Sequence, residues 1–308
     1  RHYYSIEKEA PMTFSPDAEY PLVNTEKGRF PGHFTAGFEA SDALPRLVSI
    51  KAGTKVNVVP GKAKAAVEGF EMAALEKAAA ETKEETGISF ELAAEGTVTE
   101  ITATGIGAHA STPDVGNNAL TGLLVFLGKL DFASCPQVDM VRKTASLFPH
   151  GDVNGKTLGV AMEDELSGNL TLSFNMLSVD AASMDGEFDG RIPVCGNDEN
   201  VLEVVRARMA EQGLTLLNKA LIPPHHVSAD SYFVKTLLAA FELYTGRKGE
   251  CQALGGGTYV HHLENGVAFG AAMPETDNKM HGPDEFAVVD ELLVSAKIFA
   301  QAIVDLCG

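Results

Sequence analysis

Short apolar runs that alternate with amphipathic stretches are the feature that most limits how this chain can fold. In residues 170–178, apolar side chains alternate with polar ones, the pattern of a half-buried strand. Residues 118–130 instead place four leucines on one helical face, with Asn118 as a candidate N-cap. Further strands are expected at 47–50, 56–59, 98–103 and near Val267, and further helices at 70–85, 200–212, 230–244 and 284–307. A sheet covered by helices, an α/β fold, is the prediction.

Two breaks in the pattern suggest the domain boundaries. At 308 residues the chain is too long for one minimal core. One break is Pro223-Pro224 and the other is a glycine-punctuated stretch at 28–37. We therefore expect an outer domain made of 1–28 and 228–308, with 29–227 inserted into it. Three small units in series are an alternative that the order of segments leaves open.

The two ends of the chain carry their own expectations. Segment 1–28 is punctuated by prolines and reads as a loop that leads into a strand. An arginine at position 1 hints that this is not the start of translation. The last helix should bury one apolar stripe along its length. That stripe consists of Val289, Leu292, Leu293, Ala296, Phe299 and Ile303.

Composition excludes several classes of partner. The formal net charge of −18 disfavours nucleic acid and anionic membranes, because both are bound through clustered Lys and Arg. No run approaches the ~20 apolar residues that span a bilayer. The four cysteines form no Cys-x-x-Cys pair, so neither a disulfide framework nor a sulfur zinc site is indicated. A soluble cytoplasmic protein is expected.

The stretch 255–285 gathers the most candidate chemistry. Three consecutive glycines at 255–257, followed by Thr258, let backbone N–H groups approach a ligand without Cβ obstruction. His281 then precedes the last apolar helix, where a metal-ligand or acid–base role fits an imidazole. A histidine near a helix start that opens with Asp284 and Glu285 could equally be a capping residue.

These residues resemble the M20 family of zinc peptidases, and most closely its PepV-like dipeptidase branch. The resemblance covers nearly the whole chain and lacks only the beginning of the family. It implies the C-terminal portion of an M20-type catalytic domain with an inserted α+β lid domain. It also implies hydrolysis of dipeptides or short peptides by water activated on two zinc ions, with manganese or cobalt as alternative metals.

The same resemblance suggests two metal ligands. Residues 14–21 are similar to the family's Pro-Asp-Ala-x-Phe-Pro segment, which implies that Asp17 is a zinc ligand, whereas composition alone would make it an ordinary turn aspartate. His281 is implied as the second ligand. The other ligands and the general base precede this segment in the family. The chain alone is therefore expected to be inactive, with the missing N-terminal segment as a possible separate partner.

Two pairs inside the chain have the right residue types for the absent ligands. His150-Gly151-Asp152 has His-x-Asp spacing, and Glu84-Glu85 is a double carboxylate. Both follow Asp17 in the chain rather than precede it, so their use would require a rearranged fold. We interpret the first pair as a surface loop and the second as a solvated helix end.

The inserted region carries the substrate-facing residues that the resemblance implies. Residues 105–119 look like the family's lid motif, in which His109 would donate a hydrogen bond to the developing oxyanion. Asn57 resembles an asparagine that contacts substrate. Arg191 resembles the lid arginine that holds the C-terminal carboxylate of the peptide, for which a guanidinium fork is well suited. Gly256, Gly257 and Thr258 would supply further polar contacts to that carboxylate.

Two other functions are consistent with these residues. One is a non-catalytic fragment or a peptide-binding subunit, because the recognisable residues are better suited to binding a peptide than to cleaving it. The other is a deacylase or desuccinylase of the same family, because the sequence does not identify the side-chain pocket.

Overall fold

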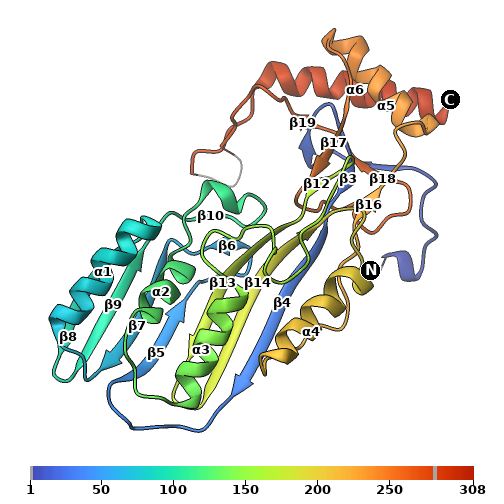
Figure 1. Cartoon of the computed structure of the whole chain (residues 1–308). Coiled ribbons are helices and arrows are strands. Elements are labelled where there is room, and N and C mark those ends of the chain that lie inside the picture. The colour runs from blue at the N-terminus through green and yellow to red at the C-terminus, as the bar shows by residue number, and fades with distance from the viewer. Residues whose placement is uncertain (1–2, 280–282) are drawn as a thin grey trace. The chain divides into compact units, whose positions relative to one another are not determined.

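The chain divides into two compact units in the computed structural model, which describes residues 3–279 and 283–308. The outer unit contains Arg1–Gly28, Asp164–Ser167 and Pro224–Gly308, and the inserted unit contains Arg29–Glu163 and Gly168–Pro223. The second division falls before Pro224 rather than after residue 227 because β16 (His225–His226) pairs with β3 (Leu22–Glu26) of the outer unit. Both units mix strands and helices (Figure 1).

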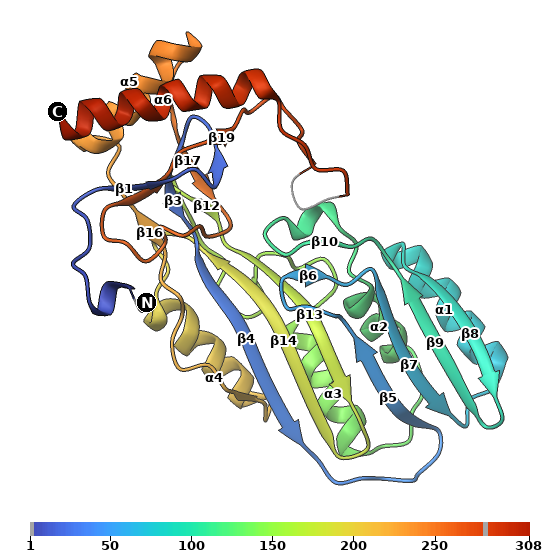
Figure 2. The same ribbon diagram turned by 180° about the vertical axis from the view of Figure 1, so that it is seen from behind.

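The inserted unit is built on an eight-stranded sheet with the order β15-β4-β14-β13-β5-β7-β9-β8. The strands are β4 (Gly28–Gly37), β5 (Arg46–Ala52), β7 (Lys62–Glu68), β8 (Ser89–Glu95), β9 (Val98–Thr104), β13 (Thr171–Val179), β14 (Ser183–Ile192) and β15 (Thr215–Leu216). Helices α1 (Met72–Thr86), α2 (Ala119–Gly128) and α3 (Pro136–Leu147) cover one face, and Figure 2 shows the opposite face from behind. Shorter elements are β6 (Val58–Val59), β10 (Ala108–His109), η2 (Pro113–Val115), β11 (Glu163–Asp164), β12 (Gly168–Asn169), η3 (Asp198–Leu202) and α4 (Glu203–Glu211).

Local sequence explains the central helix of this unit. The side chain of Asn118 accepts hydrogen bonds from the backbone N–H groups of Leu120 and Thr121, at 2.9 and 3.2 Å, and so caps α2 as predicted. The helix that follows is apolar on nearly all sides because it lies in the core between the sheet and its neighbouring helices. α1 ends at Gly87, whose φ of 74° suits the left-handed C-terminal position.

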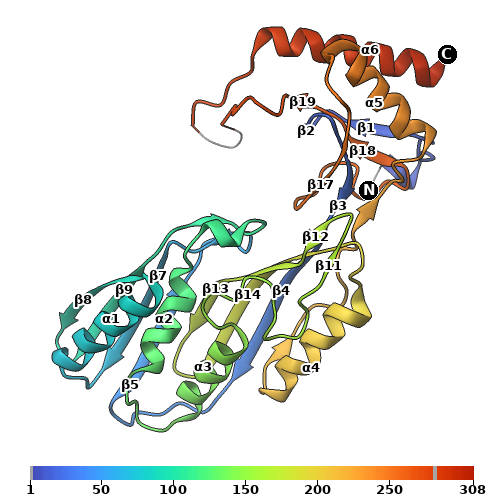
Figure 3. The ribbon, with the colours of Figure 1, turned by 45° about the horizontal axis from the view of Figure 1, so that its top comes forward.

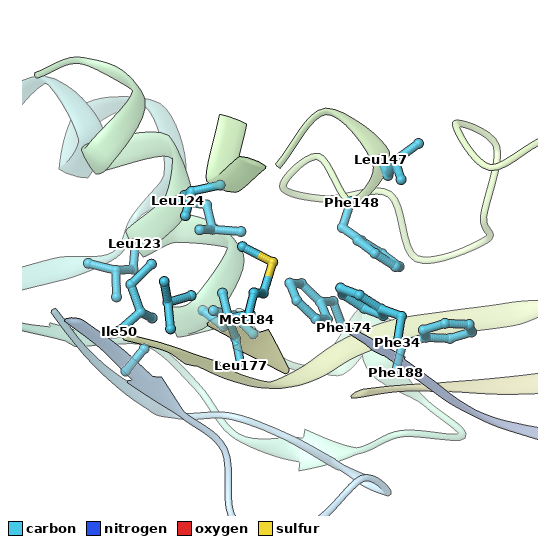
Figure 4. Packing of buried hydrophobic residues seen from close by; sticks show 14 of the residues in the cluster. Phe34, Ile50, Leu123, Leu124, Leu147, Phe148, Phe174, Leu177, Met184 and Phe188 are labelled. Atoms are coloured by element: carbon cyan, nitrogen blue, oxygen red, sulfur yellow. The ribbon is translucent and has the colours of Figure 1, made fainter. Parts of the chain in front are cut away.

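An aromatic cluster joins the sheet to α3. The ring centroids of Phe148 and Phe174 lie 4.5 Å apart, and Phe34 stacks on Phe148 at 5.9 Å. Figure 4 shows these rings packed together with Phe188. Two glycines make room for this packing, because a Cβ on Gly186 would overlap the Phe34 ring and one on Gly32 would overlap the Phe188 ring.

The outer unit contains a smaller sheet and two long helices. Its main sheet has the order β1-β18-β3-β16, and β17 also pairs with β3. The remaining elements are η1 (Tyr3–Ser5), β1 (Thr13–Ser15), β2 (Ala18–Glu19), β17 (Cys251–Leu254), β18 (Gly266–Ala268), β19 (Ala271–Ala272), α5 (Tyr232–Thr245) and α6 (Val289–Cys307). Figure 3 shows α5 beside α6. Tyr20, Phe241 and Phe269 are fully or almost fully buried in its core.

Two expectations for the outer unit were wrong in part. Segment 1–28 contributes three strands, and all five residues of β3 are buried although it was read mainly as loop. The last helix begins at Val289, and much of its predicted stripe is exposed: Val289 is 70% exposed and Leu293 57%. The buried positions are Ser295, Ile298 and Ala302, so the helix buries a narrower face than its apolar pattern predicts. No helix in the described ranges has an apolar stretch long enough to cross a bilayer.

Candidate functional site

Asn57 and His109 lie side by side in the inserted unit. Strands β6 and β10 pair antiparallel, with Val58 opposite His109. The backbone N–H of Ala110 donates to the carbonyl of Asn57 at 3.0 Å, which joins the two loops. Residues that are about fifty positions apart in the sequence are thus held next to each other by backbone pairing alone.

The geometry around His109 determines which ring nitrogen carries the proton. The backbone N–H of Ser111 donates to Nδ1 at 3.2 Å, and the Ser111 hydroxyl lies 2.7 Å from the same nitrogen. An N–H group can only donate, so Nδ1 is an acceptor and the neutral ring carries its proton on Nε2. The side chain is exposed. Nε2 of His109 is therefore the donor that an anionic oxygen would require.

Arg191 is buried and paired with Asp189 on the same strand. Its Nε donates to Oδ1 of the carboxylate and its Nη2 donates to Oδ2 at 3.0 Å, which is a bidentate arrangement. Burial raises the pKa of Asp189, while the positive charges of Arg191, His109 and Arg29 oppose that rise. His109 therefore lies within electrostatic reach of the pair. These two hydrogen bonds hold the Arg191 side chain in one orientation, and the edge of the guanidinium that makes them is not open to a ligand.

The glycine-rich turn of the outer unit is held by a buried carboxylate. The backbone N–H and the hydroxyl of Thr258 donate to Oε1 of Glu26 at 3.1 and 2.6 Å, and His261 Nδ1 lies 2.7 Å from Oε2. Burial alone would raise the pKa of Glu26, but the hydrogen bonds from His261 and Thr258 lower it overall. Both donors of Thr258 are therefore engaged with Glu26, and Thr258 anchors the turn rather than presenting those donors to a substrate.

The two glycines before Thr258 differ in their surroundings. A Cβ on Gly257 would lie 3.4 Å from Nδ1 of His261, whereas one on Gly256 would meet only the Leu254 side chain, at 3.8 Å. Gly256 therefore leaves more space for a ligand to approach the backbone than Gly257 does. The predicted ligand contacts of both glycines stay predictions.

Sequence reasoning missed the pairing of Glu26 with His261. The available signal was a carboxylate at the end of an otherwise apolar and small-polar strand, Leu22–Glu26, because a buried charge requires a partner. His261 and His262 lie in a turn, with ring centroids 5.2 Å apart.

Asp17 is exposed in the turn between β1 and β2 and lines a cavity of about 250 Å³. Asn278, Glu285 and Glu291 line the same cavity. Asn278 and Glu285 flank residues 280–282 in the sequence. His281, the second predicted ligand, is one of those three residues and lies outside the described residues. Among the described residues, no three or more His, Cys, Asp or Glu side chains group so that they could hold a metal ion. A complete metal centre is therefore not formed by them.

The two other ligand-like pairs have structural partners. His150 Nδ1 lies 2.9 Å from the Thr121 hydroxyl, and burial lowers the pKa of His150. Asp152 accepts backbone N–H groups of its own loop, including that of Thr157 at 2.8 Å. Glu85 pairs with Lys129 at 2.8 Å. Each of these side chains therefore has a contact within the inserted unit, and the interpretation that neither pair is a metal site stays a prediction.

Comparison with known proteins relates the chain to dipeptidases. No family profile matches it. It is 34% identical over 312 residues, 99% of its length, to a Bacillus subtilis protein provisionally named the dipeptidase YtjP. It is also 34% identical over 310 residues to the Beta-Ala-Xaa dipeptidase of Lactobacillus delbrueckii subsp. lactis. The chain spans 65% and 64% of the lengths of these two relatives.

A solved structure shows the same fold. The crystal structure of aminoacylhistidine dipeptidase from Vibrio alginolyticus matches 98% of this chain and 67% of that protein, with a TM-score of 0.52 and 12% sequence identity. At that identity the likeness concerns the fold alone. Taken together, this α/β chain is similar over almost all of its length to proteins that are named as dipeptidases.

Proposed function

We propose that this chain belongs to the M20 family and forms the lid and the C-terminal catalytic portion of a zinc-dependent dipeptidase or aminopeptidase that acts on short peptides in the cytoplasm. The observation that carries the proposal is the grouping of Asn57 and His109 near the Arg191–Asp189 pair in the inserted unit. The 34% identity to the Beta-Ala-Xaa dipeptidase supports the choice of a peptide as substrate.

Each of these side chains has a role that follows from its donors. Nε2 of His109 donates to the oxygen of the scissile carbonyl as that oxygen gains negative charge. Loss of one such donor costs about 3 to 4 kcal/mol of barrier in other hydrolases. The Asn57 amide offers a further neutral hydrogen-bonding group. Arg191, held in orientation by Asp189, supplies the positive charge for a peptide carboxylate.

The proposed metal is zinc, with manganese or cobalt as alternatives, and the proposed ligands in this chain are Asp17 and His281. In support, Asp17 shares its cavity with Asn278 and Glu285, which flank the segment that contains His281. The described residues alone form no group that could hold a metal ion.

We propose that the remaining ligands and the general base belong to the part of the relatives' length that has no counterpart in this chain. Such a segment would be a partner that covers apolar surface. The exposed side chains of Val289, Leu292 and Leu293 on α6 provide a surface of that kind.

A chimera tests the proposal. The part of the Lactobacillus relative outside the matched region would be joined to this chain, and hydrolysis of Beta-Ala-Xaa dipeptides would be measured with zinc, manganese or cobalt. We expect metal-dependent hydrolysis that falls roughly 10² to 10³-fold in the His109→Ala chimera. A folded, metal-loaded chimera that cleaves no dipeptide would refute the proposal.

The same experiment separates the two alternatives. Cleavage of N-acyl or N-succinyl amino acids in preference to dipeptides would identify a deacylase or desuccinylase. Dipeptide binding without any cleavage would identify a peptide-binding protein. The Asn265→Asp chimera serves as a control, because Asn265 makes an exposed contact in the outer unit with the Pro11 carbonyl.

A further inference from the structure

A small apolar cavity of about 170 Å³ lies in the inserted unit and is lined by residues of both α2 and α3. These two helices pack against each other on one face of the sheet (Figure 1). Strand β5 and the segment that joins the two helices complete the lining. The larger apolar side chains that line the cavity are Leu47, Leu124, Leu127, Phe132, Val138 and Val141.

The walls of this cavity are fixed by the fold. Its leucines and valines are buried. The Phe132 ring packs edge-on against Phe70, with the ring centroids 5.0 Å apart. The backbone N–H of Ala133 donates to the carbonyl of Pro45 at 2.8 Å, which ties the joining segment to the start of β5. A cavity formed in advance loses less conformational freedom when a ligand binds.

Gly128, the last residue of α2, leaves the cavity open on one side. It is exposed and lines the cavity, and a Cβ built on it would meet no heavy atom within 4 Å. Glycine is less favourable than alanine within a helix, and packing does not require a glycine where a Cβ has room. The free space beside Gly128 is therefore an entrance.

The volume and lining of the cavity define the apolar part of a ligand. In another protein, an engineered cavity of roughly 150 Å³ lined by Leu, Ile and Phe stays dry and binds benzene. The cavity between α2 and α3 is similar in size and lining. Water gains few hydrogen bonds among such side chains, so an apolar group displaces it favourably. One aromatic ring, or a branched alkyl group of that size, fits this space.

Arg142 supplies a positive charge at the cavity. It is exposed, lines the cavity, and makes no hydrogen bond or ion pair with another described residue. Its planar guanidinium matches a carboxylate in shape. No Asp or Glu is among the described residues that line the cavity, so the ammonium group of an amino acid would gain no partner there. The charge therefore favours an anion over a zwitterion or a cation.

We propose that this cavity binds a small monocarboxylate with a single apolar group, such as phenylacetate, with the ring among the leucines and valines and the carboxylate on Arg142. Asn118 caps the start of α2 at the end of the lid motif, whereas Gly128 ends the helix. The ten residues of α2 extend about 15 Å. The cavity is thus at the end of α2 away from the lid motif, and the site requires neither a metal nor peptidase activity.

The test is a titration of the whole chain, followed through leucine methyl signals by NMR. The probes are phenylacetate, its neutral counterpart phenylacetamide, the cation phenethylamine, and acetate, which lacks the ring. We expect phenylacetate to shift the signals of Leu124 and Leu127, identified by their loss in Leu124→Met and Leu127→Met. Phenylacetamide should bind about threefold to tenfold more weakly because it lacks the charged contact, and the other two probes more weakly still.

Variants separate the charge from the cavity. Arg142→Gln should weaken phenylacetate about threefold to tenfold and leave phenylacetamide unchanged. Lys143→Gln, at an exposed neighbour that does not line the cavity, is the matched control and should change neither. Gly128→Leu places a side chain in the entrance and should weaken both ligands at least tenfold. Gly128→Ala favours the helix and should weaken them less, which separates filling of the entrance from misfolding.

Unmoved Leu124 and Leu127 signals, or equal phenylacetate affinity in Gly128→Leu and the unaltered chain, would overturn the proposal. Phenethylamine binding as tight as that of phenylacetate, or no effect of Arg142→Gln, would overturn the carboxylate assignment. Acetate binding as tight as that of phenylacetate would overturn the apolar one. Sedimentation of the free chain completes the test, because a dimer that is lost in Gly128→Leu would assign the cavity to a second copy of the chain and refute a small ligand.

Discussion

The side chain of Asn175 donates a hydrogen bond of 2.6 Å to the backbone carbonyl of Val56, the residue before Asn57. Asn175 is fully buried and lies where the pairing of β13 with β14 shifts register between Phe174 and Met176. Such bulges redirect a side chain out of the regular alternation of a strand. The central sheet of the inserted unit therefore supports the loop that carries Asn57.

Replacing Asn175 by Asp should weaken this support. A carboxylate cannot donate to the Val56 carbonyl, so two buried acceptors would face each other there, at a cost of about 2 kcal/mol or more. We expect faster hydrogen exchange at the Ala110 N–H, which is bonded to Asn57, than in the unaltered chain. Asn265→Asp, which removes an exposed bond to the Pro11 carbonyl, is the matched control. Unchanged exchange at Ala110 would contradict this role of Asn175.

Glu26→Gln should destabilise the glycine-rich turn of the outer unit. The buried carboxylate binds Thr258 and His261, and the loss of charged hydrogen bonds costs about 1 to 3 kcal/mol. Hydrogen exchange at the Thr258 N–H, which donates to Glu26, measures the effect within that unit. Glu76→Gln on α1 removes an exposed carboxylate and should change little.

The stabilisation by Glu26 should depend on pH in one direction. Its folded pKa lies below the ordinary value of 4.5, so the stabilisation is fully present above pH 4.5 and is lost as the pH falls through the folded pKa. The difference between Glu26→Gln and the unaltered chain should therefore be constant near neutrality and narrow below pH 4.5. A difference that widens in acid would show that the carboxylate is not stabilised in its ionised form.

His109 should hold its proton on Nε2 when the ring is neutral. The contacts of Ser111 with Nδ1 favour that tautomer. Nitrogen-15 NMR of the labelled ring distinguishes the two tautomers directly. Ser111→Ala removes the hydroxyl contact and keeps the backbone N–H, so the Nε2–H form should fall in population but still predominate. Observation of mainly the Nδ1–H form in the unaltered chain would remove the proposed oxyanion donor.

Zinc should bind weakly to this chain by itself. Asp17 and His281 are its predicted ligands, and structural or catalytic zinc sites use three or four protein ligands. After gel filtration in zinc-free buffer, elemental analysis should find far fewer than two equivalents of metal. Asp17→Asn should lower whatever remains, while Asp114→Asn, in the lid motif, should not. Retention of close to two equivalents would mean that the chain carries a complete site.

Much of the inserted unit follows from local sequence, but strand β14 does not. The helix behind Asn118 and the strand at 171–179 appear where their periodicities predict them. Strand β14 carried no such signal because glycines occupy apolar positions of its inward face. The Phe34 ring fills the space above Gly186, so the apolar side chain that covers β14 there comes from another strand.

The outer unit was harder to predict because its polar residues are buried. Prolines in 1–28 suggested loop, whereas β3 buries Asn24, Thr25 and Glu26 with partners distant in sequence. No local pattern shows such partners. Conversely, the apolar stripe of α6 was read as core, and Leu293 is exposed because periodicity reports an apolar face without reporting what covers it.

In the candidate site, too, local motifs predicted some features, whereas contacts between side chains were not predicted. Short motifs singled out Asn57 and His109 as candidates, and backbone pairing of their segments brings them together. Arg191 was also located, but its engagement with Asp189 was not, since a pair two residues apart on one strand reads equally well as a surface ion pair. Glu26 was missed because its significance lies in its burial and in partners that are distant in the sequence, which a linear pattern does not reveal.

The interlocking of Phe34 with Gly186 and of Phe188 with Gly32 has an evolutionary consequence. Each glycine is the counterpart of a ring on the adjacent strand, so neither can change unless that ring also shrinks. In a mutational library, both codons would appear as invariant as those of a reacting side chain. Failure to tolerate substitutions at Gly32 and Gly186 would then reflect steric packing between two strands. Assigning functional residues from invariance alone would therefore misplace the functional centre of this protein.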